Sequence, residues 1–125
     1  MVELQPTRES PARARDAISR LRGLLDQRTY ADLELLVSEL VTNAVRHASL
    51  APDDLIRLEV THSDEHLRLE VSDEGIGFNP GSPRPAPDGG SGWGLYLADR
   101  VAARWGVTKV GGMTRVWAEW DLRPG

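Results

Sequence analysis

The chain has 125 residues, of which 40% are hydrophobic and 27% charged, and its formal net charge at pH 7 is −4. This length suits one domain, residues 1–125, with a buried core, and an acidic balance argues against direct nucleic-acid binding, which normally needs a basic surface. The absence of cysteine excludes disulfides and thiolate metal sites. No apolar run is long enough to span a membrane, and the charged N-terminus is unlike a signal peptide, so we expect a cytoplasmic protein.

The first predicted element is a helix over residues 10–26. Ser10 is a plausible N-cap, Pro11 suits the first helical position, and apolar residues from Ala14 to Leu25 recur at helical spacing. Arginines occupy the other face of this helix. They are typical of a solvated basic face, and a partner-binding face is the alternative.

The second predicted helix, over residues 30–49, has the clearest amphipathic pattern. Its apolar stripe includes Leu33, Leu36, Val37, Leu40, Val41, Ala44 and Ala48. Glu39, Asn43 and His47 are four residues apart, so they follow one line along the flank of that stripe. Taken alone, they could be an ordinary polar flank; beside the two glycine motifs described below, they indicate a binding site.

Two strands follow, over residues 56–61 and 67–72, because apolar and polar residues alternate in both. The short link at residues 63–66 predicts a hairpin, and His62 and His66, near the turn, are expected at the surface rather than on a metal. Alternation buries one face and exposes the other, which is typical of an antiparallel sheet covered by helices on one side.

A loop of about 14 residues, 79–92, follows the motif Asp73-Glu74-Gly75-Ile76-Gly77. Its Pro, Gly and Ser content excludes a helix or a strand ladder, and we interpret it as a lid, with an inert insertion as the alternative. A third helix over residues 93–104 and two strands over 107–110 and 114–122 complete the chain. Gly111-Gly112 predicts a tight turn between these strands.

Four segments carry a family resemblance. They are Ser38-Glu39-Leu40-Val41-Thr42-Asn43-Ala44-Val45-Arg46-His47-Ala48, Val71-Ser72-Asp73-Glu74-Gly75-Ile76-Gly77-Phe78, Gly92-Trp93-Gly94-Leu95-Tyr96-Leu97 with the following Asp99-Arg100-Val101-Ala102, and Thr114-Arg115-Val116-Trp117. In this order the chain resembles the GHKL (histidine kinase-like) ATPases, and most of all the stand-alone anti-sigma-factor serine kinases and their actinobacterial relatives.

This resemblance implies a fold and two ligands. The fold is a two-layer α/β (α+β) sandwich of the Bergerat type, with a mixed, mostly antiparallel sheet of four or five strands covered on one face by three helices. The implied cofactors are ATP and Mg²⁺.

The resemblance also implies roles for individual residues. Asn43 would be the Mg²⁺ ligand, and Asp73 would accept a hydrogen bond from the adenine amino group. Thr114 would support that carboxylate, with an exposed strand threonine as the alternative. Glu39 matches the carboxylate that orients or deprotonates the attacking hydroxyl or water.

The resemblance implies further nucleotide-binding residues: two glycine pairs, the leucine that follows the second pair, and one histidine. They are Gly75, Gly77, Gly92, Gly94, Leu95 and His47. Phosphate would depend on Arg46, Arg84 and backbone amides. His47 lies inside the nucleotide-site helix and is not expected to be a phosphoacceptor.

The leading functional hypothesis is an ATP- and Mg²⁺-dependent regulator that phosphorylates a serine on a small anti-anti-sigma protein and sequesters a sigma factor, with homodimerisation open. A second hypothesis is a nucleotide-dependent protein-binding module that is catalytically weak or inactive. A third is a catalytic domain excised from a larger sensor kinase. Nucleic acid and membrane are not expected partners.

Overall fold

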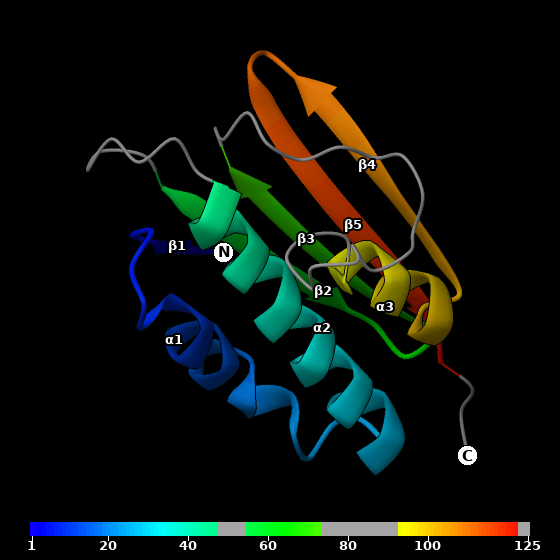
Figure 1. Cartoon of the computed structure of the whole chain (residues 1–125). Coiled ribbons are helices and arrows are strands. Elements are labelled where there is room, and N and C mark those ends of the chain that lie inside the picture. Colours follow the sequence, from blue (N-terminus) through cyan, green and yellow to red (C-terminus); the bar gives the residue numbers. More distant parts are fainter. Residues whose placement is uncertain (48–54, 74–92, 123–125) are drawn as a thin grey trace.

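A computed structural model of the protein describes residues 1–47, 55–73 and 93–122 (Figure 1). In chain order the elements of these ranges are β1 (Val2–Leu4), α1 (Ser10–Ala17), the 3-10 turn η1 (Ser19–Leu21), α2 (Gln27–His47), β2 (Ile56–His62), β3 (His66–Asp73), α3 (Trp93–Val101), β4 (Arg104–Val110) and β5 (Met113–Asp121). None of these helices is long and apolar enough to cross a lipid bilayer.

The strands form one sheet in the order β1-β2-β3-β5-β4, and every neighbouring pair is antiparallel. The predicted hairpin of β2 and β3 is confirmed, as is the tight turn at Gly111-Gly112, where both glycines have positive φ. The prediction of a mixed sheet is wrong for the described strands, since none of them pairs in parallel.

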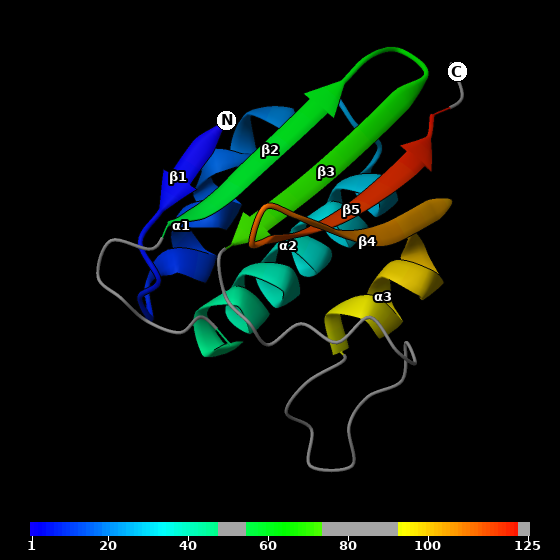
Figure 2. The same cartoon turned by 90° about the horizontal axis from the view of Figure 1, so that it is seen from above.

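The three helices cover one face of this sheet (Figure 2). The alternating strand residues supply the sheet side of the core, and the apolar stripe of α2 supplies most of the helix side. Fully buried core residues include Leu33, Leu36, Val37, Val41, Leu67, Leu69, Ala98 and Ala118. The predicted two-layer sandwich is confirmed, and α2 lies across its centre between α1 and α3.

The first helix is shorter than its periodicity predicts. It ends at Ala17, and Ser19 then donates a hydrogen bond of 2.6 Å from its hydroxyl to the carbonyl oxygen of Asp16, which satisfies one of the free carbonyls at the helix end. Ser10 is not the N-cap: that position is Glu9, and the Ser10 hydroxyl instead donates to the carbonyl oxygen of Gln5.

The second helix starts earlier than predicted because Asp26 caps it. The backbone N–H of Thr29 donates to the Asp26 carboxylate at 2.8 Å, and the Thr29 hydroxyl donates to the other carboxylate oxygen at 2.8 Å. These hydrogen bonds, the backbone one first, lower the pKa of Asp26. The helix therefore begins at Gln27 rather than at residue 30.

The open face of the sheet carries a chain of ion pairs. Arg68 binds Glu119 at 2.6 Å and Glu70 at 2.9 Å, and Arg104 binds Glu119 at 3.1 Å and Asp121 at 2.6 Å. Hydrogen bonds from Arg68 and then from Arg104 hold the pKa of Glu119 below its usual value. The two guanidinium groups thus link three carboxylates along a face that stays in contact with solvent.

Gly106 in β4 makes room for an aromatic ring on that open face. A Cβ atom added to Gly106 would lie 2.8 Å from the ring of Trp117, its register partner on β5, and the guanidinium of Arg68 lies 4.7 Å from that ring's centroid. The missing side chain thus lets Trp117 lie flat over β4 and under Arg68.

We expect Gly106→Ala to destabilise the protein by about 1–3 kcal/mol, because the new methyl group must displace the ring and its contact with Arg68. Urea unfolding measures this change. Gly23→Ala is the matched control, since a Cβ atom at Gly23 meets nothing within 4 Å. Equal midpoints for the two variants would show that the ring yields without cost.

Candidate functional site

The central helix α2 presents different residues to its two neighbouring helices. Arg15 of α1 donates a hydrogen bond of 3.1 Å to the Ser38 hydroxyl, and Arg22 lies 3.8 Å from Glu34, so this flank faces α1. Each helical residue advances about 100°, which places Asn43 roughly 140° from Ser38 and roughly 180° from Glu34. Asn43 therefore lies on the flank that faces α3, which packs on α2.

The Asn43 side chain is buried without a complete set of partners. It is 2% exposed, and its Nδ2 atom has no hydrogen-bond partner among the residues that the structure describes. A buried amide that lacks a partner costs roughly 1–3 kcal/mol, and a water molecule, an ion or a ligand can complete it. An anionic oxygen suits the Nδ2 donor and a hard cation suits the Oδ1 acceptor. The Asn43 amide thus fits a phosphate and Mg²⁺ together.

Glu39 lies one turn before Asn43 on the same helix. It is half-buried and about 40° from Asn43 around the helix axis, further from the core. This position leaves the carboxylate accessible beside the buried amide. His47 is the last residue of α2 and follows Asn43 by one turn.

Asp73 and Thr114 meet across the sheet. Asp73 ends β3, Thr114 begins the part of β5 that pairs with β3, and the two are directly opposite in the antiparallel register. Such residues have Cβ atoms roughly 4.5–5.5 Å apart and point to the same face. Asp73 is 7% exposed and Thr114 is 3% exposed, so the alternative of an exposed strand threonine is wrong.

This polar pair interrupts an apolar face. The same face of β3 carries Leu67, Leu69 and Val71 before Asp73, and all three are buried in the core. Burying a carboxylate and a hydroxyl at the end of that row is costly unless hydrogen bonds satisfy them. A buried carboxylate beside a buried hydroxyl is an arrangement that recognises an amino group, such as the exocyclic amine of adenine.

The two parts of the site lie at one end of the fold. In Figures 1 and 2 the C-terminal ends of α2 and β3 and the turn between β4 and β5 are at the same end of the molecule, and α2 packs on β3. The structure thus gathers residues that are 71 positions apart in the sequence, Asn43 and Thr114, near one end of one core.

The glycine motifs are only partly described. Gly94 and Leu95 lie in the first turn of α3, where backbone N–H groups have no partner within the helix and suit an anion. Gly75, Gly77, Gly92, Arg84 and the predicted lid, residues 79–92, lie outside the described residues. Arg46 is an exposed residue of α2.

Comparisons with known proteins bear on the whole chain. The family model of the histidine kinase-like ATPase domain matches residues 4–120. No curated protein matches the chain. Among solved structures, the RsbU and RsbW domains of Rv1364c from Mycobacterium tuberculosis match with a TM-score of 0.70 and 20% identity over 99% of this chain and 33% of the other.

Two kinases also match. The blue-light activated histidine kinase EL346 from Erythrobacter litoralis gives a TM-score of 0.64 and 28% identity over 89% of this chain and 40% of the other. The mycobacterial sensor histidine kinase MprB gives 0.55 and 19% over 99% of this chain and 100% of the other. The chain thus spans between a third and two fifths of the first two structures, and the likenesses below 25% identity show the fold.

Proposed function

Because the chain belongs to the family of histidine kinase-like ATPase domains, we propose that it binds ATP with Mg²⁺ at the end of the fold where α2 and β3 terminate, and that it transfers the γ-phosphoryl group to a protein serine. The observation that carries this proposal is the buried Asn43 side chain, whose Nδ2 atom has no hydrogen-bond partner within the described ranges. It lies on the helix that packs on β3, and Asp73, the last residue of β3, forms a buried pair with Thr114.

In this proposal, different residues bind the base and the phosphates of the nucleotide. Asp73, with Thr114 beside it, accepts a hydrogen bond from the adenine amino group. Guanine is rejected because it presents a carbonyl, which cannot donate, at that position. Asn43 holds the cation and a phosphate oxygen through its two amide atoms. The start of α3, with Gly92, Gly94 and Leu95, offers backbone N–H groups to the phosphates. Gly75 and Gly77, which have no side chains, leave room for the adenine ring.

Mg²⁺ supplies charge neutralisation of the phosphates when it is bound. Among the residues that the structure describes, no group of three or more Asp, Glu or His side chains could hold a metal ion. A site built on one amide oxygen therefore depends on phosphate and water oxygens for its other ligands, as Mg²⁺ sites on nucleotides commonly do.

We propose Glu39 as the general base of the transfer. Its half-buried position one turn from Asn43 supports this role, because the attacking hydroxyl must approach the phosphate from the accessible side of the site. Glu39 accepts the hydroxyl proton as the serine oxygen bonds to the γ-phosphorus and ADP leaves.

The finer proposal is a cytoplasmic anti-sigma-factor serine kinase, whose substrate is a small anti-anti-sigma protein and whose second partner is a sigma factor, with a homodimer as the working assembly. The motif order around Asn43, Asp73 and Gly94 supports it, and the fold likeness to a chain that includes an RsbW domain is compatible with it. The rival function is a nucleotide-dependent binding module that transfers no phosphate.

The Glu39→Ala variant distinguishes the two functions. We expect it to bind ATP as the wild type does and to lose at least about 100-fold in phosphoryl transfer, since a general base contributes about 10²–10⁴-fold. The measurements are calorimetric ATP binding and phosphoserine formation on a small protein captured from lysate with ATP. Glu34→Ala, on the α1 flank of the same helix, is the matched control. Equal phosphoserine yields for the wild type and both variants would contradict the role of Glu39 as general base. No phosphoserine with the wild type would favour the binding module.

A further inference from the structure

The free edge of the sheet beside β1 is only half covered. Strand β1 pairs with residues 56–58 of β2, whereas β2 continues to His62. On this side, the stretch from Glu59 to His62 has no paired strand within the described ranges. Alternate residues of an uncovered edge present backbone N–H and C=O groups to solvent, and such an edge accepts a further strand.

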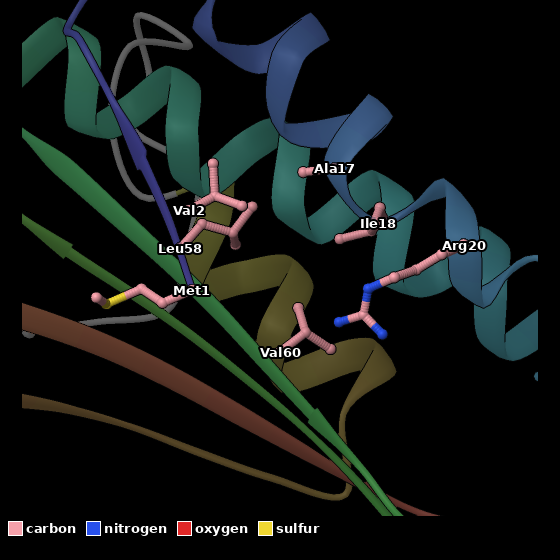
Figure 3. Close-up of a pocket in the computed structure, with 7 residues that line it drawn as sticks. All are labelled: Met1, Val2, Ala17, Ile18, Arg20, Leu58 and Val60. Carbon is pink, nitrogen blue, oxygen red and sulfur yellow. The ribbon is translucent and has the colours of Figure 1, made fainter.

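A groove opens beside that uncovered stretch, between β2 and the end of α1 (Figure 3). Its lining encloses a volume of about 110 Å³ and combines aliphatic side chains with one arginine: Met1, Val2, Leu58 and Val60 on the sheet side, and Ala17, Ile18 and Arg20 on the helix side. A cavity of about 150 Å³ admits benzene, so this groove has room for one branched aliphatic side chain.

Arg20 gives the groove a cation. Figure 3 shows its guanidinium extending from η1 toward Val60. Arg20 is exposed, and no hydrogen bond or ion pair joins it to the part of the chain that the structure describes. An unpaired guanidinium at the mouth of an apolar groove complements a carboxylate that arrives with an apolar side chain.

The surrounding charge selects the kind of partner. Residues 8–28 carry arginines at 8, 13, 15, 20, 22 and 28 but acidic residues only at 9, 16 and 26, whereas the whole chain has a net charge of −4. A second copy docked through the same surface would bring two basic segments together and repel. An acidic segment of another protein meets the opposite charge.

We propose that this groove docks an extended, acidic segment of a partner protein, which adds as a strand to the edge of β2. In an antiparallel pair, directly opposite residues point to the same face, so the partner residue opposite Val60 points into the groove with an apolar side chain. The partner residue two positions away returns to that face, where Arg20 meets a carboxylate. The recognition pattern is therefore an apolar residue and an acidic residue separated by one position.

This docking surface is distinct from the nucleotide site. Arg15 places α1 beside Ser38 of α2, and Arg22 places the turn after η1 beside Glu34. Asn43 lies on the other flank of α2. The proposal does not rest on the proposed function, and nucleotide is absent from its test.

Synthetic heptapeptides test the proposal on the ¹⁵N-labelled full chain by NMR titration. The probes are Ser-Thr-Leu-Thr-Glu-Thr-Ser, the reversed order Ser-Thr-Glu-Thr-Leu-Thr-Ser, and versions with Leu replaced by Ser or Glu replaced by Lys. We expect saturable amide shifts at residues 17–20 and 59–62 for at least one of the first two peptides, and affinity at least about tenfold weaker for both replacements.

Protein variants give the matched comparison. Arg20→Glu should weaken binding at least about tenfold, and Ala17→Leu should weaken it by filling the groove, whereas Arg28→Glu, an exposed arginine of the same basic segment outside the groove, should change it little. No saturable shift at these residues for either peptide order, or equal loss in Arg20→Glu and Arg28→Glu, overturns the proposal. Concentration-dependent dimerisation that Arg20→Glu abolishes would also overturn it, in favour of a second copy as the occupant.

Discussion

Replacing Asn43 by alanine is expected to remove Mg²⁺-dependent ATP binding, with an affinity loss of at least about 100-fold, while the fold stays intact. The Asn43 amide offers an acceptor, Oδ1, to the cation and a donor, Nδ2, to a phosphate oxygen, and alanine removes both. Stability should change by no more than about 1 kcal/mol, because the lost Nδ2 atom is buried with no hydrogen-bond partner in the described part of the chain, and its removal relieves that cost.

Calorimetric titration of ATP with and without Mg²⁺, together with thermal unfolding, checks both halves of this expectation. Ser38→Ala is the matched control: it lies on α2 but faces α1, where its hydroxyl accepts a hydrogen bond from Arg15. It should keep the metal dependence of binding. If Asn43→Ala binds ATP with the same Mg²⁺ dependence as the wild type, the assignment of the metal ligand is wrong.

Asp73→Asn should remove the preference for adenine. The wild type is expected to bind ATP at least about 100-fold more tightly than GTP, because a site built to hydrogen-bond one group leaves buried polar atoms unpaired when an analogue lacks it. The amide keeps the shape of the carboxylate but loses its charge and half of its acceptor capacity. ATP affinity should fall toward that of GTP.

Competition between ATP and GTP for a fluorescent nucleotide measures this preference. Ser72→Ala is the control, since Ser72 precedes Asp73 on β3 but points to the opposite face of the sheet. Thr114→Val, which keeps the shape and removes the hydroxyl, should weaken ATP less than Asp73→Asn does. A wild type that binds ATP and GTP equally would contradict the role of Asp73.

Local sequence patterns predicted most of the fold because each element carries its own periodic signal. The stripe from Leu33 to Ala44 has a period near 3.6 and the residues from Ile56 to Val71 have a period of 2, so helix, hairpin and one-sided burial followed without tertiary information. The helix ends were less well predicted. The Asp26 cap and the early end of α1 at Ala17 depend on side-chain hydrogen bonds that compete with the periodic pattern.

Strand β1 shows the opposite case. Val2–Leu4 is only three residues long, and a period of 2 cannot be recognised in so short a segment. It becomes a strand because β2 offers an edge to pair with. The proposed docking groove could not be predicted from the sequence either. Its walls come from the sheet and from the end of α1, and their separation is set by packing.

The kinds of group at the proposed nucleotide site could be read from the chain alone: an amide and a carboxylate on one helix, a carboxylate at the end of a strand, and glycines at a helix start. Folding buries Thr114 opposite Asp73 and leaves Asn43 Nδ2 without a partner among the described residues, because register and burial arise from strand pairing and helix packing between segments far apart in the chain. The types of residue are given by the sequence. Their closeness to one another and their removal from water, on which their chemistry depends, arise only when the core folds.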